Sequence, residues 1–231
     1  RRGRLNNEDN PMTHLPFATG GSLEIRRVFC VGRNYAEHAK EMGHDSREPP
    51  FFFAKAPEAL ILGPEVPYPP MTADLHHEVE LVVAIGRDGA EIGVEAARSH
   101  IAGYAVGIDL TRRDLQAIAK KQARPWALAK SWIGAAPIGT LHAPAEVGHP
   151  RTGRIELKVN GAVRQSGDLA EMIWSVDEII AELSRYDRLL AGDLIMTGTP
   201  AGVGPLVAGD QVEVVIQGVG AAKFAITAPA G

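Results

Sequence analysis

The chain has 231 residues, of which 45% are hydrophobic and 23% charged, an ordinary globular composition. Its 24 basic and 28 acidic side chains give a formal charge of −4 and are interspersed along the sequence, which argues against nucleic-acid binding. No apolar run reaches the roughly 20 residues of a membrane helix, and the opening residues are too polar for a signal peptide. We therefore expect a cytoplasmic protein that binds no nucleic acid and no membrane.

The first 22 residues mix charged residues with Asn, Pro and Gly and show no periodicity. This pattern predicts a flexible N-terminal extension over residues 1–22. The remaining residues, 23–231, are expected to form a single domain, because that length is usual for one domain. Cys30 is the only cysteine, so any bound metal must be held by oxygen or imidazole.

Strands and short helices are predicted along the first half of the chain. Residues 27–31 are typical of a short strand, and residues 34–42 have helical character that places His38 and Glu41 on one face. The segment LHHEVELVVAIG, residues 75–86, alternates strictly, as a strand does. Another strand ends at Asp109, and a helix with Thr111 as its N-cap follows. Arg113, Gln116 and Lys120 fall on one face of that helix.

The second half of the chain is richer in strands. Asn160-Gly161 lies between two strand-like segments and predicts a β-hairpin with a type I′ turn. Ser175 and Glu178 form a capping box that opens a helix. Three further strands, each bounded by Gly or Pro, are predicted at residues 193–198, 211–217 and 221–227. The sum is an α+β, β-rich fold with a few short helices.

Three carboxylates are the strongest candidates for a metal site. Glu78 and Glu80 lie two apart on one predicted strand, so their side chains point the same way, and Asp109 ends a second strand. An isolated pair of this kind is usually a solvated strand face. Here the strand continues into an apolar run, which favours an interior position. We call Glu78, Glu80 and Asp109 the carboxylate cluster; oxygen ligands alone favour Mg²⁺, Mn²⁺ or Ca²⁺.

Several segments, in this order, resemble the fumarylacetoacetate hydrolase family: VGRNYAEHAKEMG, PPFFFAKAP, DLHHEVELVVAIG, GYAVGIDLTRRDLQ, LAKSW and IMTGTPAGVG. The resemblance covers residues 28–220 and is strongest to the bacterial fumarylpyruvate hydrolases of gentisate breakdown. It implies a mixed β-sandwich roll, a catalytic domain over residues 23–231 and a homodimer.

The resemblance also implies roles for individual residues. The carboxylate cluster matches the family's metal ligands, for Mg²⁺ or Mn²⁺, with Ca²⁺ as a further option. His38 matches a catalytic base that Glu41 holds in place, although a lone His on a helix is more often structural. The other matches are Lys130 beside the metal and three substrate contacts, Arg113, Gln116 and Thr199. Without the resemblance, these four would be ordinary residues of a helix face, a strand end and a tight turn.

Two positions are left without a clear role. Lys55 lies in a matching segment, but nothing in the sequence assigns it a function. Relatives of this kind often carry an acidic residue three positions after the lysine that Lys130 matches, and Ile133 stands there instead. Either the pKa of Lys130 is tuned differently or its acidic partner comes from elsewhere.

The implied activity is metal-dependent hydrolysis of the C–C bond of an acylpyruvate, with 3-fumarylpyruvate giving fumarate and pyruvate. Other acylpyruvate hydrolysis, oxaloacetate decarboxylation and oxo-acid tautomerisation remain alternatives, because all use a similar enolate. An alternative of another class is a non-catalytic metal-binding β domain. The loop over residues 43–50, rich in Gly, Pro and charged residues, is a candidate lid.

Overall fold

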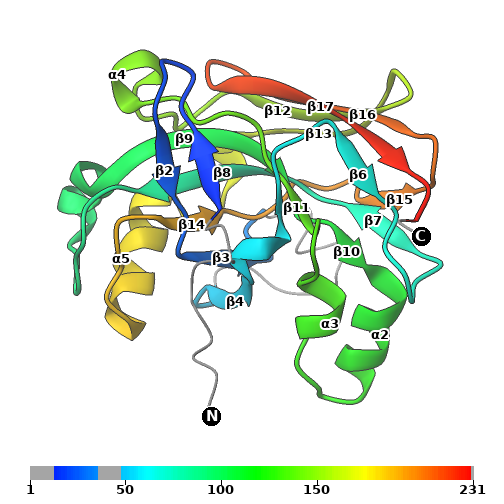
Figure 1. Cartoon of the computed structure of the whole chain (residues 1–231). Helices are drawn as coiled ribbons and strands as arrows, with labels where there is room; N and C mark the ends of the chain where they lie inside the picture. The colour runs from blue at the N-terminus through cyan, green and yellow to red at the C-terminus, as the bar shows by residue number, and fades with distance from the viewer. Residues whose placement is uncertain (1–12, 36–47, 230–231) are drawn as a thin grey trace, which may run out of the picture.

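Two five-stranded sheets that pack against each other form the body of the protein (Figure 1). The computed structural model describes residues 13–35 and 48–229. In spatial order, the first sheet contains β4 (Phe51–Lys55), β3 (Arg27–Gly32), β14 (Asp193–Met196), β8 (Val79–Ile85) and β9 (Ile101–Ile108). The second contains β13 (Ala162–Asp168), β12 (Arg154–Val159), β16 (Gln211–Ile216), β17 (Gly220–Thr227) and β6 (Glu65–Pro67).

Smaller elements surround these sheets. Three small sheets pair β1 (His14–Pro16) with β2 (Ser22–Glu24), β7 (Leu75–His77) with β10 (Thr111–Arg112) and β15 (Gly204–Leu206), and β5 (Leu60–Ile61) with β11 (Ala136–Pro137). Within the described residues, the α-helices are α2 (Arg113–Lys121), α3 (Ala127–Lys130), α4 (Pro144–Val147) and α5 (Val176–Tyr186), and the 3₁₀ turns are η1 (Pro57–Ala59), η2 (Val94–His100) and η3 (Leu169–Glu171). The predicted β-rich α+β fold is confirmed. Within the described ranges, no helix is long and apolar enough to cross a membrane.

Strand β8 separates two hydrophobic clusters. Val79, Leu81 and Val83 pack toward the second sheet, whose strands contribute Leu157 and Val214 to the same cluster. Side chains on the other face of β8 pack into a second cluster with residues of β3 and β14. The continuous apolar run over residues 81–85 therefore marks a strand that is buried on both faces, in the centre of the molecule.

Two local predictions are confirmed by the backbone. Asn160 and Gly161 have φ angles of 52° and 79°, as the type I′ turn between β12 and β13 requires. Ser175 accepts a hydrogen bond from the amide of Glu178 and caps α5. The predicted helix around His38 and Glu41 falls mostly outside the described residues.

The predicted extension over residues 1–22 is wrong in its second half. Strands β1 and β2 form an antiparallel pair in which Leu15 faces Leu23, and Leu15 is fully buried. Leu15 packs with Ile25 and Leu141, so burial of one apolar side chain holds this segment against the domain. Residues 1–12 lie outside the described part of the chain.

The predicted N-cap at Thr111 is also wrong. Thr111 belongs to the short strand β10, and α2 begins two residues later, after Arg112. The hydroxyl of Thr111 accepts a hydrogen bond from Lys130 Nζ (2.7 Å) and donates to the carbonyl of Asp109 (3.2 Å). Its side chain therefore serves the neighbouring site instead of the helix start.

Candidate active site

The carboxylate cluster assembles where the chain passes from one sheet to another. The predicted single strand over residues 75–86 is interrupted at Glu78, which lies between β7 and β8. Val79 pairs with Ile108, and the amide of Asp109 donates to the carbonyl of Glu78 at 2.8 Å. This register brings Asp109 beside the two glutamates, and all three offer a carboxylate oxygen within 4.8 Å of one another. The structure thus brings the three predicted carboxylates together, and all three are buried.

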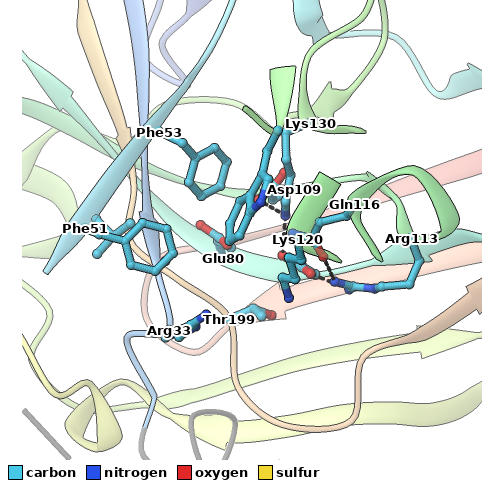
Figure 2. A pocket seen from close by; sticks show the side chains of 14 residues that line it. Arg33, Phe51, Phe53, Glu80, Asp109, Arg113, Gln116, Lys120, Lys130 and Thr199 are labelled. Carbon is cyan, nitrogen blue, oxygen red and sulfur yellow. Dashed lines mark hydrogen bonds and ion pairs between the residues drawn. The ribbon is translucent and has the colours of Figure 1, made fainter. Parts of the chain in front are cut away.

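Lys130 neutralises two members of the cluster. It ends the short helix α3, and its Nζ donates to Glu78 Oε2 at 2.8 Å and to Asp109 Oδ2 at 2.7 Å (Figure 2). Burial alone would lower the pKa of Lys130, but the charges of Asp109 and Glu78 outweigh it and raise that pKa. Lys130 is therefore a permanent cation at the floor of the site.

The structure answers the question that Ile133 raised. The side chain at position 133 is 84% exposed, so it does not face Lys130. The acidic partners of Lys130 are Glu78 and Asp109, which come from other segments. An acidic residue at position 133 is thus not needed to pair this lysine.

Lys55, which the sequence left without a role, is a second buried lysine of the cluster. It ends β4, and its Nζ lies 2.7 Å from Asp109 Oδ1. It also donates to the backbone carbonyls of Leu110 (3.2 Å) and Lys130. Lys55 therefore pairs with the second oxygen of Asp109 and ties the end of α3 to the first sheet.

Arg113 and Gln116 lie at the side of the cluster, on the predicted face of α2. Arg113 Nη2 is 2.5 Å from Glu78 Oε1, and Arg113 Nη1 donates to Gln116 Oε1 at 2.6 Å. Burial alone would raise the pKa of Glu78, but Lys130 and Arg113 outweigh it and lower that pKa. Glu78 is therefore ionised and held in place from both sides.

Glu80 is different, because its charge is not balanced. Among the residues that the structure describes, no basic side chain forms an ion pair with Glu80; its Oε2 accepts from the amide of Gly198 at 2.9 Å. Burial, then repulsion from Asp109 and Glu78, raises the pKa of Glu80 well above its usual range. A divalent cation that oxygen ligands prefer would supply the missing positive charge, so the donor set fits Mg²⁺ or Mn²⁺.

A sharp turn after β14 borders the cluster. Gly198 has a φ of +98°, and a Cβ there would lie 2.7 Å from Asn34 Cβ, so only glycine suits the position. Thr199 lines the pocket, as predicted, and its hydroxyl accepts a hydrogen bond from Gln165 Nε2 at 2.8 Å. This turn presents both the amide that binds Glu80 and the hydroxyl of Thr199.

Gln165 is a further residue that the sequence did not reveal. It lies on β13 and is buried, and besides Thr199 its amide donates to the carbonyl of Pro200 at 2.9 Å. Its Oε1 accepts from the amide of Val79 at 3.0 Å and lies 2.9 Å from His77 Nδ1. Burial lowers the pKa of His77, which favours the neutral ring as the donor in that contact.

The upper part of the pocket combines aromatic and basic side chains. Phe51 and Phe53 lie edge-on to Trp126, with ring centroids 5.5 and 5.8 Å away. Lys120 Nζ is 5.2 Å from the centre of Trp126, and the guanidinium of Arg33 is 5.4 Å from that of Phe51. These side chains line the same pocket as the carboxylate cluster, and Figure 2 shows Phe51, Phe53, Lys120 and Arg33 around Glu80 and Asp109.

Some of the predicted site residues lie together in the structure, and others lie outside the described residues. The carboxylate cluster, Lys130, Arg113, Gln116 and Thr199 line one pocket, as expected. His38 and Glu41 lie outside the described residues, as does most of the candidate lid over residues 43–50. Their roles stay predictions.

The comparisons with known proteins agree with this geometry. Residues 27–227 match the family model described as fumarylacetoacetate (FAA) hydrolase C-terminal. A provisionally named fumarylpyruvate hydrolase from Burkholderia cenocepacia is 50% identical, with a TM-score of 0.92 over 99% of this chain and 100% of the other. The fumarylpyruvate hydrolase of Pseudomonas aeruginosa, solved with Mn²⁺ and pyruvate, is 44% identical, with a TM-score of 0.93 over 96% and 100%.

A curated relative has a different activity. The mitochondrial oxaloacetate tautomerase of Mus musculus is 42% identical over 206 residues, which cover 87% of this chain and 91% of the relative. The family resemblance seen in the sequence motifs is thus confirmed over nearly all of the described residues. The chain belongs to the fumarylacetoacetate hydrolase family.

Proposed function

We propose that this protein is a divalent-metal-dependent hydrolase that cleaves 3-fumarylpyruvate to fumarate and pyruvate. The observation that carries this proposal is a buried carboxylate cluster flanked by fixed cations, Lys130 and Arg113, at the base of one pocket. The likeness to the P. aeruginosa fumarylpyruvate hydrolase with Mn²⁺ and pyruvate supports both the ion and the substrate class.

The carboxylate cluster would hold the ion, and Mg²⁺ or Mn²⁺ suits its oxygen ligands. Such an ion stabilises negative charge that develops on the oxygens of a 2-oxo acid. Lys130 keeps Glu78 and Asp109 in position from one side, and the Gly198 amide orients Glu80 from the other. The ligands are therefore held in place before any ion binds.

Hydrolysis needs a water molecule, a base and a place for an electron pair. The water adds to the C4 carbonyl carbon, and the C3–C4 bond then breaks. The acyl half leaves as fumarate, and the electron pair stays on pyruvate as the enolate, which takes up a proton at C3. His38, held by Glu41, is the predicted base. Lys130 and Arg113 provide positive charge beside the enolate, and Gln116 and Thr199 offer hydrogen bonds to the substrate.

Oxaloacetate tautomerisation is the second candidate. It needs the same stabilised enolate, but only a proton moves at C3 and no water is consumed. The 42% identity to the mouse oxaloacetate tautomerase favours it. The difference between the two reactions lies in a positioned water, which a pocket of the same residues can either admit or exclude.

The decisive measurement is the ultraviolet absorbance of fumarylpyruvate. We expect a rapid loss of absorbance with Mn²⁺ or Mg²⁺, no loss with excess chelator, and recovery when the ion is restored. The same protein is assayed for relaxation of enol-oxaloacetate to its keto form. Stable fumarylpyruvate with fast oxaloacetate relaxation would replace the hydrolase by the tautomerase. Inactivity toward both, with Mn²⁺ still bound, would indicate a non-catalytic metal-binding domain.

A further inference from the structure

Among the described residues, two basic side chains that line the pocket do not pair with its carboxylates. Arg113 pairs with Glu78, whereas Lys120 and Arg33 line the same pocket and form no ion pair with a carboxylate among the residues described. We call Lys120 and Arg33 the distal pair. Lys120 projects from α2 one turn beyond Gln116, and Arg33 follows directly after β3. Two separate elements thus bring cations to the part of the pocket above the carboxylate cluster.

Lys120 is held in surroundings that disfavour a cation. Burial, followed by the charges of Arg113 and Arg33, lowers the pKa of Lys120 to about 8. Lys120 lies over Trp126 and Arg33 over Phe51, two rings that contact each other, and Figure 2 shows both cations on the side of the pocket near Thr199. An anion placed between them would relieve this repulsion.

Aromatic rings contact both cations of the distal pair. Lys120 lies over Trp126 and Arg33 over Phe51, at the cation–π distances given above. Phe51 and Trp126 also contact each other edge to face. The pocket therefore has the carboxylate cluster, which binds a cation, at one end and the distal pair, which suits an anion, at the other. Aromatic rings line the wall beside the distal pair.

We propose that the distal pair binds the second carboxylate of a dicarboxylic acylpyruvate, so that this pocket selects substrates charged at both ends. The inference rests on the proposed function, since the cluster is taken to hold the 2-oxo acid end. A bridging carboxylate would accept hydrogen bonds from both cations, and charge-assisted bonds of this kind are the stronger ones. Acylpyruvates with an uncharged acyl group, such as acetylpyruvate, would lack this contact.

The test is a binding experiment with two unreactive seven-carbon acids, 2-oxoheptanedioate and 2-oxoheptanoate. They differ only in the distal carboxylate, and neither has the 4-oxo group that hydrolysis needs. Dissociation constants are measured by calorimetry with Mn²⁺-loaded protein at pH 7. We expect the wild type to prefer the diacid by about tenfold or more, as one charge-assisted contact is worth about 1.5–3 kcal/mol.

The variants Lys120→Gln and Arg33→Gln should each reduce this preference severalfold, and Lys120→Arg should retain most of it. Lys121→Gln is the matched control, because Lys121 is the exposed next residue of α2 and does not line the pocket. Oxalate binding and circular dichroism verify that each variant is folded and keeps its metal end.

A wild type without preference, or a preference that survives both Gln variants, would overturn the proposal. Equal weakening of both acids by Lys120→Gln would also overturn it, because the lysine would then serve the 2-oxo acid end. The preference is measured on acids that are not cleaved, so it can be found even if fumarylpyruvate is stable. Failure of the distal pair is therefore distinguishable from failure of the hydrolase.

Discussion

The two faces of strand β8 show how one segment serves stability and chemistry at once. The face with Val79, Leu81 and Val83 is apolar and packs against the second sheet. The opposite face begins with a carboxylate and continues into apolar Val82 and Ala84. Both faces are buried, so the difference lies in what each requires from its surroundings: the apolar face requires close packing, and the acidic end requires cations.

The energetic difference between the faces is large. Two unit negative charges about 4 Å apart repel by about 4 kcal/mol at an effective dielectric constant of 20. The cluster holds three carboxylates within 4.8 Å, and only Glu78 and Asp109 have basic partners among the described side chains. The apolar face therefore stabilises the fold, and the acidic end costs stability until a metal ion binds.

The largest effect is expected where a buried cation is removed from the acidic side. Lys55→Met keeps the volume of the side chain but leaves Asp109 Oδ1 without its ammonium partner. We expect the metal-free protein to lose about 3–5 kcal/mol of unfolding free energy, as for other buried pairs from which one member is removed. Denaturant unfolding in the presence of chelator measures the loss. A loss below about 1 kcal/mol would show that Asp109 does not depend on Lys55.

On the apolar face, Leu81→Ala should cost about 2–5 kcal/mol of unfolding free energy, because it leaves a cavity between the two sheets. The side chain of Leu81 is completely buried in the core, on the face of β8 opposite Glu80. We therefore expect the Mn²⁺ dissociation constant of the folded protein to stay within about threefold of wild type. Calorimetric Mn²⁺ titration beside the unfolding curve tests whether the two faces are separable.

The third change affects metal affinity more than stability. Glu80→Gln retains an oxygen that can accept a hydrogen bond from the amide of Gly198 but removes the charge. We expect the Mn²⁺ affinity to fall about 100-fold or more, which is a larger loss than when a residue that only orients a ligand is changed. Without metal, the variant should melt higher than wild type, because an unbalanced buried charge is gone.

The sign of the pH dependence follows from the raised pKa of Glu80. A carboxyl group whose pKa is raised in the folded state favours folding at low pH, and that contribution is lost as the pH rises through the raised pKa. The melting advantage of Glu80→Gln in chelator should therefore grow as the pH increases. An advantage that shrinks with rising pH would mean that Glu80 is already balanced by a cation.

Much of the fold could be predicted because its signals are local. The alternation along β8, the Asn160-Gly161 turn and the capping box at Ser175 each involve neighbours in sequence, and each is found in the structure. The carboxylate cluster could also be predicted from the sequence, because two of its members lie two residues apart on one strand. Its completion by Asp109 depended on the strand end that the sequence already suggested.

The residues that sequence reasoning missed act across long separations. Gln165 contacts Val79 across 86 positions, and Lys55 reaches the carbonyl of Lys130 across 75. No periodicity marks such partners, because they are defined by how sheets and helices pack. The wrong N-cap prediction at Thr111 has the same origin. The capping rule considers only neighbours in sequence, whereas the Thr111 hydroxyl binds Lys130, which is distant in sequence.

Gln165 links the hairpin of β12 and β13 to the residues beside the carboxylate cluster. Its amide joins β13 to the start of β8 and to the turn at Thr199, so sliding of the hairpin would disturb several ligands together. Lys120, in contrast, projects from a peripheral helix that does not bear on this linkage. Under the role proposed for the distal pair, exchange of Lys120 would change the acyl specificity and leave the carboxylate cluster unchanged.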